Sequence, residues 1–180
     1  WSVGGLSGGA DDNCVGTAGS FTVTSPPTLA PTTSLAPTMT PAPTISPTNA
    51  PTLVPTLGRD DACDFDTDMC SFSNVGSYAW TRNSGSTSSS GTGPSSDHTS
   101  GSGYYMYVEA SGNYPSKAFV LESALDAPAS DVEFYYHMYG AAIGTLSLEV
   151  SSDSGATWTA AWSLSGNNGN LWTLAAVPLS

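Results

Sequence analysis

The chain has 180 residues, of which 15 are Asp or Glu and only 3 are Lys or Arg, so its formal net charge is −12. This charge argues against nucleic acid and against an anionic membrane surface as partners, because both are bound through Lys and Arg. No apolar run approaches the roughly 18 residues of a membrane span, so membrane insertion is not expected within this chain. The chain has neither an initiating Met nor a signal peptide at its start, and we expect Trp1 to begin a processed or partial chain.

Composition divides the chain into three regions. Residues 1–24 are Gly-rich and contain one short alternating stretch, "SFTVTS". Residues 25–58 are rich in Pro and Thr and contain no aromatic residue, so they cannot bury a core. Residues 59–180 carry all eight tyrosines and most of the five tryptophans, and we predict that they form the globular part.

The Pro-Thr region has a proline at every fourth position from 43 to 55, and a threonine follows each one. This repeat favours a polyproline II helix, in which successive Pro-Thr pairs turn by about 120° and advance by ~12 Å, so that their hydroxyls face all sides. Tracts of Ser and Thr with Pro are typical of O-glycosylated stalks. The alternative is a disordered spacer that only sets distance.

Glycan attachment is expected on this repeat, which resembles those of algal and other protist surface glycoproteins. No Asn-x-Ser/Thr sequence occurs, so N-glycosylation is not expected. The candidate O-glycosylation sites are Thr28, Thr32, Thr38, Thr44, Thr48, Thr52, Thr56 and Ser46. The hydroxyproline candidates are Pro43, Pro47, Pro51 and Pro55.

The globular part contains four segments that alternate or run apolar and are rich in β-branched and aromatic residues. These segments, predicted to be strands, are 104–110, 117–123, 132–140 and 144–153. "SGNNGN" at 165–170 is typical of a hairpin turn. Because no stretch has a sustained helical period, we expect an all-β jelly roll or sandwich. The predicted core consists of Phe65, Phe72, Trp80, Tyr107, Phe119, Leu121, Phe134, Tyr136, Met138, Leu146, Leu148, Trp162 and Trp172.

The three cysteines lie at positions 14, 63 and 70, so at least one has no partner within the chain. Cys63 and Cys70 are close enough in sequence to form a short disulfide loop, which is typical of a secreted or cell-surface protein. The absence of Cys-x-x-Cys and the scarcity of His argue against zinc.

No catalytic residue is assigned from the sequence. Asp97 and His98 do not predict a catalytic triad, because adjacent side chains on an extended chain point apart. The Gly-x-Ser-x-Gly elbow of the serine hydrolases is also missing. His137 is expected to be a strand residue packed among aromatic rings.

The segments "CDFDTDMCSF", "FYYHMYGAAIGTLSLEV" and "WSLSGNNGNLW", in this order, resemble the MAM domain from Cys63 to the C-terminus. The resemblance implies a jelly-roll β-sandwich that serves as a non-catalytic module of extracellular proteins. It also implies that Cys63 and Cys70 form the first of two family disulfides. The second disulfide is expected to be missing, because no Cys lies near Asp131, and the closing strands of the family are expected to be absent.

Missing closing strands would leave a hydrophobic cleft or an unpaired edge in the sandwich. "SFTVTS" or "WSVGGLSGG" would then be a donor strand that fills the cleft of another copy. Alternatively, residues 1–24 are the tail of a preceding domain, and Cys14 is its last cysteine.

A cation site is a further expectation near the disulfide, where Asp64, Asp66 and Asp68 crowd together. In MAM-like domains, an acidic residue at the position of Asp66 would pair with Asp97. Carboxylates and carbonyls suit calcium. The alternative is that these aspartates are turn formers and surface charge.

Three functions remain open from the sequence. The first is a structural extracellular glycoprotein that self-associates as the repeating unit of a glycan-coated filament. The second is an adhesion module displayed on a mucin-like stalk. The third is a non-catalytic accessory module of a secreted hydrolase, whose catalytic domain would lie outside this chain.

Overall fold

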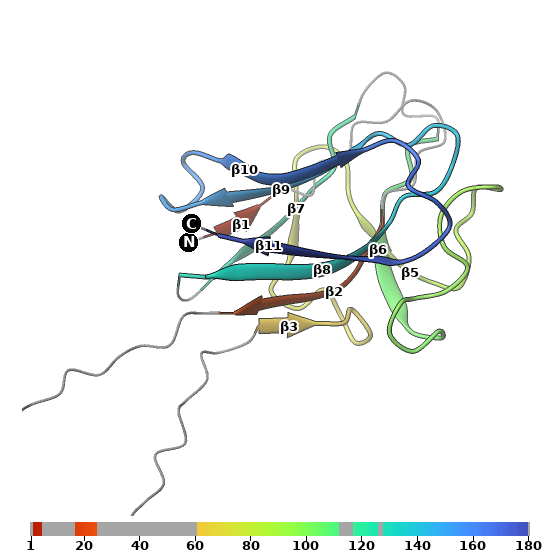
Figure 1. Ribbon diagram of the computed structural model, residues 1–180, viewed down its shortest axis with the longest axis horizontal. Helices are drawn as coiled ribbons and strands as arrows, with labels where there is room; N and C mark the ends of the chain where they lie inside the picture. The colour runs from red at the N-terminus through yellow and green to blue at the C-terminus, as the bar shows by residue number, and fades with distance from the viewer. Residues whose placement is uncertain (1, 5–16, 25–60, 112–116, 126–127, 180) are drawn as a thin grey trace, which may run out of the picture.

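The computed structural model describes residues 2–4, 17–24, 61–111, 117–125 and 128–179, and the regular elements in these ranges are all β-strands (Figure 1). The strands are β1 (Ser2–Gly4), β2 (Thr17–Thr24), β3 (Asp61–Cys63), β4 (Ser73–Val75), β5 (Thr81–Ser84), β6 (Tyr104–Tyr107), β7 (Val120–Ala124), β8 (Asp131–His137), β9 (Thr145–Ser151), β10 (Thr159–Ser165) and β11 (Thr173–Pro178). They form two antiparallel sheets, which confirms the expected all-β sandwich. In these ranges there is no helix with the length and hydropathy of a membrane span.

The chain passes repeatedly from one sheet to the other. The five-stranded sheet has the order β10-β9-β1-β7-β4, and the six-stranded sheet has the order β11-β8-β2-β6-β5, with β3 also paired to β2. Several strands that follow each other in sequence, such as β8 and β9, therefore lie in different sheets. Connections that cross between two packed antiparallel sheets are characteristic of jelly rolls.

The two strands from the Gly-rich N-terminal region are interior strands, each with a neighbouring strand on both sides (Figure 1). β1 pairs with β7 on one side and with β9 on the other. β2 pairs with β8 on one side and with β3 and β6 on the other. "SFTVTS" and "WSVGGLSGG" thus each overlap a strand that occupies an interior place in the sandwich of the same chain.

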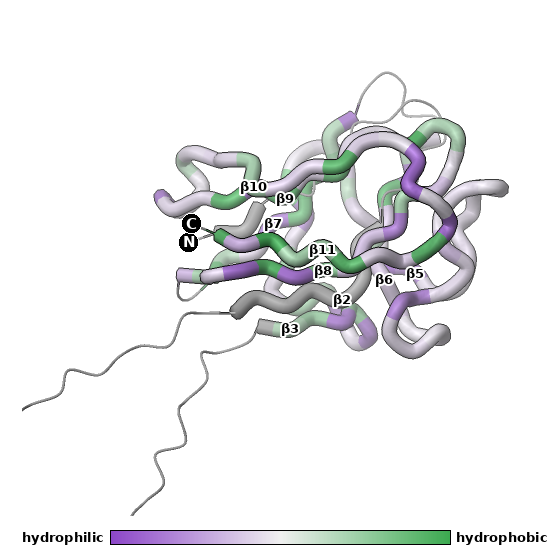
Figure 2. Tube along the Cα trace, in the orientation of Figure 1, coloured by the Kyte–Doolittle hydropathy of each residue, from purple (hydrophilic) through white to green (hydrophobic). Residues whose placement is uncertain are grey.

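The core between the sheets follows from the period of two along each strand. Figure 2 shows hydrophilic and hydrophobic residues alternating along β8, where Val132 and Phe134 are fully buried. Of the residues predicted for the core, those that are buried in it are Phe65, Trp80, Phe119, Leu121, Phe134, Met138, Leu146 and Leu148. Phe72, Tyr136 and Trp162 are partly buried and pack against it.

Two predicted core residues lie elsewhere. Tyr107 and Trp172 do not belong to the cluster between the sheets, and β6 instead contributes Met106 to it, followed by Val108. The prediction placed the aromatic Tyr107 in the core, but the alternate residues of this segment, Met106 and Val108, are the ones that face it. Tyr107 contacts Tyr105 on the outer side of the sheet, where their ring centroids are 6.3 Å apart.

The hairpin expected at 165–170 is wrong. β10 and β11 flank this segment, but β10 pairs with β9 and β11 pairs with β8, in different sheets. The connection crosses from one sheet to the other and is held by Asn168 N, which donates to Met138 O at 2.7 Å. Gly166 and Gly169 have φ of 75° and 91°, so the turn chemistry was identified correctly and the pairing of the flanking strands was not.

Candidate functional site

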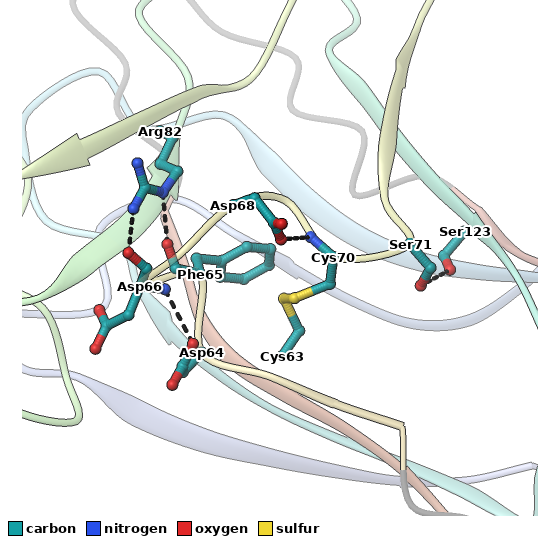
Figure 3. Close-up of a disulfide and its surroundings, with 9 residues drawn as sticks. All are labelled: Cys63, Asp64, Phe65, Asp66, Asp68, Cys70, Ser71, Arg82 and Ser123. Atoms are coloured by element: carbon teal, nitrogen blue, oxygen red, sulfur yellow. Dashed lines mark hydrogen bonds between the residues drawn. A yellow bond between two sulfur atoms is a disulfide. The ribbon is translucent and has the colours of Figure 1, made fainter.

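The turn between Cys63 and Cys70 is closed by their disulfide and by two aspartate side chains (Figure 3). Asp64 Oδ1 accepts a hydrogen bond from Asp66 N at 2.9 Å, and Asp68 Oδ1 accepts one from Cys70 N at 2.7 Å. A carboxylate that accepts from the amide two residues ahead is an Asx turn. Asp64 and Asp68 therefore act as turn formers, one of the two roles considered for this acidic cluster.

Phe65 lies within this turn with φ of 63°, a left-handed conformation that bulky residues rarely adopt. Arg82 of β5 holds it in place, because its Nε donates to Phe65 O at 2.6 Å and its Nη2 donates to Asp66 O (Figure 3). The Arg82 guanidinium also lies 3.5 Å from the centroid of the Tyr104 ring, which is a cation–π contact. Arg82 thus ties the disulfide turn to β5 and β6.

Asp66 and Asp97, the residues predicted to bind calcium, are brought together at the start of β6. Asp66 Oδ1 accepts from Tyr104 N at 2.7 Å, and Asp97 Oδ1 accepts from Gly103 N at 2.7 Å. Gly103 is needed here, because a Cβ at this position would collide with the Asp66 carboxylate. Two carboxylates 31 positions apart in the sequence therefore cap consecutive backbone amides.

Asp97 is 5% exposed, and its second oxygen, Oδ2, accepts from Ser100 N at 2.7 Å. The Ser100 hydroxyl donates to the same carboxylate at 3.2 Å. Burial alone would raise the pKa of Asp97, but the hydrogen bonds from Ser100, Gly103 and Thr99 outweigh it and hold the pKa below its ordinary value. The structure therefore keeps an ionised carboxylate at the centre of this loop.

Backbone amides and the Ser100 hydroxyl account for the hydrogen bonds that Asp66 and Asp97 make. Calcium takes roughly six to eight oxygen ligands, and the described ranges contain no group of three or more His, Cys, Asp or Glu side chains placed to hold a metal ion. The carbonyl oxygens of Phe65 and Asp66 already accept from Arg82. These residues do not make a full calcium site, and calcium binding at Asp66 and Asp97 stays a prediction.

A second set of packed aromatic side chains lies on the outer face of the six-stranded sheet, under the loop of residues 85–103. Tyr105 is fully buried there, and its hydroxyl donates to Gly85 O at 2.7 Å. Trp172 Nε1 donates to Ser96 O at 3.0 Å. The loop is therefore fixed to the sheet by hydrogen bonds from side chains that the core prediction placed between the sheets or left out.

His98 belongs to the same loop and stacks on Tyr135, with ring centroids 3.4 Å apart and planes inclined by 16°. Its Nδ1 is buried and has no hydrogen-bond partner within the part of the chain that the structure describes. The Asp97 carboxylate is bonded instead to loop amides and to the Ser100 hydroxyl. Asp97 and His98 are thus not arranged as the acid and base of a triad.

His137 is a buried strand residue among aromatic rings, which confirms the expectation for it. Its ring centroid is 5.5 Å from that of Trp172, and its Nε2 bonds to Asn170 Oδ1 at 3.0 Å. Burial lowers the pKa of His137, and the hydrogen bond to Asn170 opposes this shift only in part. A neutral imidazole is therefore the form that the fold favours.

Exposed side chains also lie along the pair of strands β8 and β11 and just before β11. Leu171 is 75% exposed and Leu174 is 46% exposed, and Leu174 lies opposite Tyr135 in the register. Glu133 lies two residues before Tyr135 on β8 and is exposed on the same face. We call these four residues the β8–β11 surface. Sequence reasoning missed it, although the alternation of Leu174 with the small core-facing Ala175 was a usable signal.

The Pro-Thr region lies outside the described residues, and so does Cys14. The same holds for every candidate glycosylation and hydroxyproline position, from Thr28 to Thr56. Modification of these positions stays a prediction from the sequence.

Comparison with known proteins identifies relatives over the globular part. A family model described as MAM domain, meprin/A5/mu, matches residues 63–180. The chain is 39% identical to MAM domain-containing protein 2 of Mus musculus over 123 residues, which cover 66% of this chain and 18% of that protein. It is 41% identical to MAM domain-containing glycosylphosphatidylinositol anchor protein 1 of Homo sapiens over 135 residues, which cover 67% of this chain and 14% of that protein.

A further relative is Neuropilin-1a of Danio rerio, with 34% identity over 121 residues that cover 62% of this chain and 13% of that protein. The chain thus spans less than a fifth of the length of each of these relatives. No solved structure matches it significantly.

Proposed function

Because this chain belongs to the MAM domain family, we propose that it is an adhesion module of an extracellular or cell-surface protein, and that its β8–β11 surface binds a protein partner. MAM domains occur in extracellular and cell-surface proteins, and one relative is by name a glycosylphosphatidylinositol anchor protein. The observation that carries the proposal is the pair of exposed leucines, Leu171 and Leu174, beside an ordered sheet. Exposed apolar patches mark interaction sites, and these two leucines lie three positions apart, at the start of β11 and just before it.

A protein partner fits this surface better than a sugar. Sugars are bound by aromatic rings whose faces are open, but the Tyr135 ring is covered by His98 at 3.4 Å. Trp172 is only partly exposed and lies edge-on to Tyr105, at 5.8 Å. The apolar side chains that remain open are leucines, which favour contact with apolar protein surface.

The charge of the chain adds a second requirement for the partner. The formal net charge is −12, and Glu133 is exposed on the β8–β11 surface itself. Attraction between opposite charges speeds encounter and suppresses wrong partners. We therefore propose a partner that combines an apolar patch with surrounding Lys and Arg.

The test compares two matched substitutions in the tetramerised full chain, with binding to cells measured by flow cytometry. Leu174→Asp alters the proposed surface, whereas Val75→Asp alters an exposed residue of similar accessibility, 41%, on β4 in the other sheet. We expect Leu174→Asp to reduce binding at least tenfold and Val75→Asp to leave it unchanged. Removing surface proteins with protease should abolish binding, whereas removing glycans should not.

Two results would contradict the proposal. Equal losses from Leu174→Asp and Val75→Asp would show that the β8–β11 surface has no special role. Binding that survives protease but not glycosidase would assign the partner to the glycans.

The other functions expected from the sequence have less support. The reported relatives are named for MAM domains, a membrane anchor or neuropilin, and they give no support to a filament. An accessory role beside a secreted hydrolase stays a prediction, since it depends on a catalytic domain outside this chain. An adhesion module needs no catalytic residue, and we propose none.

A further inference from the structure

The strands that the N-terminal region contributes hold both sheets together. In the five-stranded sheet, β1 is the only strand between β9 and β7. In the six-stranded sheet, β2 is the strand between β8 and β6. Six positions of β2 have register partners on β8. Withdrawal of residues 2–24 would therefore divide each sheet in two.

The core beside these strands is largely apolar, although Ser123 of β7 and Ser151 of β9 are buried as well. Phe134 of β8 lies opposite Phe21 in the register and is fully buried. Leu148 of β9 and Leu121 of β7 are buried on the two strands that flank β1. Without an inserted strand pair, the rest of the sandwich would expose apolar core and unpaired backbone, both of which are costly in water. Among the described residues, β1 and β2 fill the interior places that the strands from residue 61 onward leave open.

The connector between donor and sandwich is far longer than its task requires. Val23 of β2 and Asp61 of β3 are register partners, so the chain leaves β2 and enters β3 at adjacent positions. Antiparallel neighbours are ordinarily joined by roughly two to five residues. Here residues 25–60 intervene, and they contain nine of the 13 prolines of the chain.

The proline content of the connector disfavours the close approach of its two ends that the pairing of β2 with β3 requires. At ~3.1 Å per residue, an extended polyproline II segment of this length would separate its ends by on the order of 100 Å. The pairing of β2 with β3 requires the same ends to lie about 5 Å apart. Even a flexible linker gives an effective concentration only on the order of mM, and the stiff segment expected from the sequence would lower it further.

We propose that β1 and β2 are an exchangeable pair of donor strands that completes the sandwich of a second copy of this chain. The exchanged and the closed forms contain the same strand ladders, so the connector and the density of chains decide between them. Dilute chains close on themselves, as in Figure 1. Chains at high density, such as on a cell surface, exchange donors and become linked through their stalks.

Disulfide trapping across the β2–β8 ladder tests this directly in the full chain. Thr22 and Glu133 are register partners, and opposed residues of an antiparallel pair are about 4.5–5.5 Å apart between Cα atoms, within the range that a disulfide spans. One chain carries Thr22→Cys and the other, isotopically labelled, carries Glu133→Cys, both with Cys14→Ser. The two are unfolded together without reductant, refolded at high concentration, oxidised, and resolved on non-reducing gels and by mass spectrometry.

The expected result is a disulfide-linked heterodimer between Thr22→Cys and Glu133→Cys chains, several times more abundant than for the control pair. The control pairs Thr22→Cys with Ser163→Cys, an exposed position on β10 in the other sheet. For this pair the heterodimer yield should not exceed that from random collision. A variant with an Asn-Gly turn in place of residues 25–59 should give a monomer, because a short connector favours closure.

Two outcomes would overturn the proposal. The first is a heterodimer yield no greater than that of the Ser163→Cys control at the highest concentration reached. The second is undiminished heterodimer formation in the variant with the Asn-Gly turn, which would show that the connector has no influence on exchange. A failure here leaves the adhesion proposal intact, since the Leu174→Asp comparison does not depend on strand exchange.

Discussion

Replacement of Asp97 by Asn should destabilise the fold even when no calcium is present. The Asp97 carboxylate is buried and accepts from Gly103 N through Oδ1 and from Ser100 N through Oδ2, both at 2.7 Å. Asn offers one acceptor oxygen and one NH₂ group. One of the two loop amides would therefore face a donor instead of an acceptor.

The magnitude follows from the bond that is lost. A hydrogen bond to a charged group contributes about 1.5 to 3 kcal/mol, and leaving a buried donor unsatisfied is costly in its own right. For Asp97→Asn we expect a loss of about 3 kcal/mol in the free energy of unfolding. In a protein of this size, each kcal/mol lowers Tm by about 2 to 4 °C.

The assay is denaturant unfolding followed by tryptophan fluorescence, run in EDTA and again in excess calcium. Asp68→Asn is the matched control, because Asp68 is exposed and an Asn oxygen can still accept from Cys70 N. This control should change stability by no more than about 0.5 kcal/mol.

Two results would refute this account of Asp97. One is an Asp97→Asn chain as stable as the wild type in EDTA. The other is a wild-type chain that loses as much stability in EDTA as the substitution removes, which would assign the carboxylate to a bound cation rather than to the loop amides.

Arg82→Lys should lower the free energy of unfolding by about 1 to 2 kcal/mol, because lysine cannot donate to the carbonyls of Phe65 and Asp66 with a fixed fork; urea unfolding at neutral pH measures this, and unchanged stability would contradict it. His137 has a pKa lowered by burial, so the unfolded chain takes up a proton before the folded one does. The wild type should therefore lose stability as pH falls below about 6.5, by at most about 1.4 kcal/mol per pH unit. A His137→Gln chain should lose less stability over the same interval. Equal losses in the wild type and in His137→Gln, measured by urea unfolding at pH 7.5 and 5.5, would exclude this role.

The parts of the fold that could be predicted are those governed by local pattern. Leu146 and Leu148 alternate with polar residues along β9, and this alternation identified both the strand and its buried face. The disulfide turn was also predictable, because two cysteines that enclose several aspartates indicate a tight, capped loop. Local signals of this kind need no knowledge of what packs on the far side.

The errors arise where distant segments decide the outcome. On β6, Met106 faces the core while Tyr105 faces outward, yet both are fully buried. An alternating pattern identifies a buried face only when the other face is exposed, and here residues 85–103 cover it. The crossing at 165–170 failed for a similar reason, since a turn sequence does not specify which sheet receives the next strand.

The coverage of the outer face also accounts for the position of the proposed binding surface. On one part of the six-stranded sheet, the loop of residues 85–103 is bonded to the buried Tyr105 and to Trp172. His98 of this loop also covers Tyr135 of β8, whereas Glu133, nearer the start of β8, and Leu174 of β11 remain exposed. A rigid sheet backed by a core on one side, and anchored by a packed loop at one end, presents its open half with little freedom to rearrange. Contact with that half would therefore require little ordering of the chain, which is the condition under which exposed apolar side chains contribute most to binding.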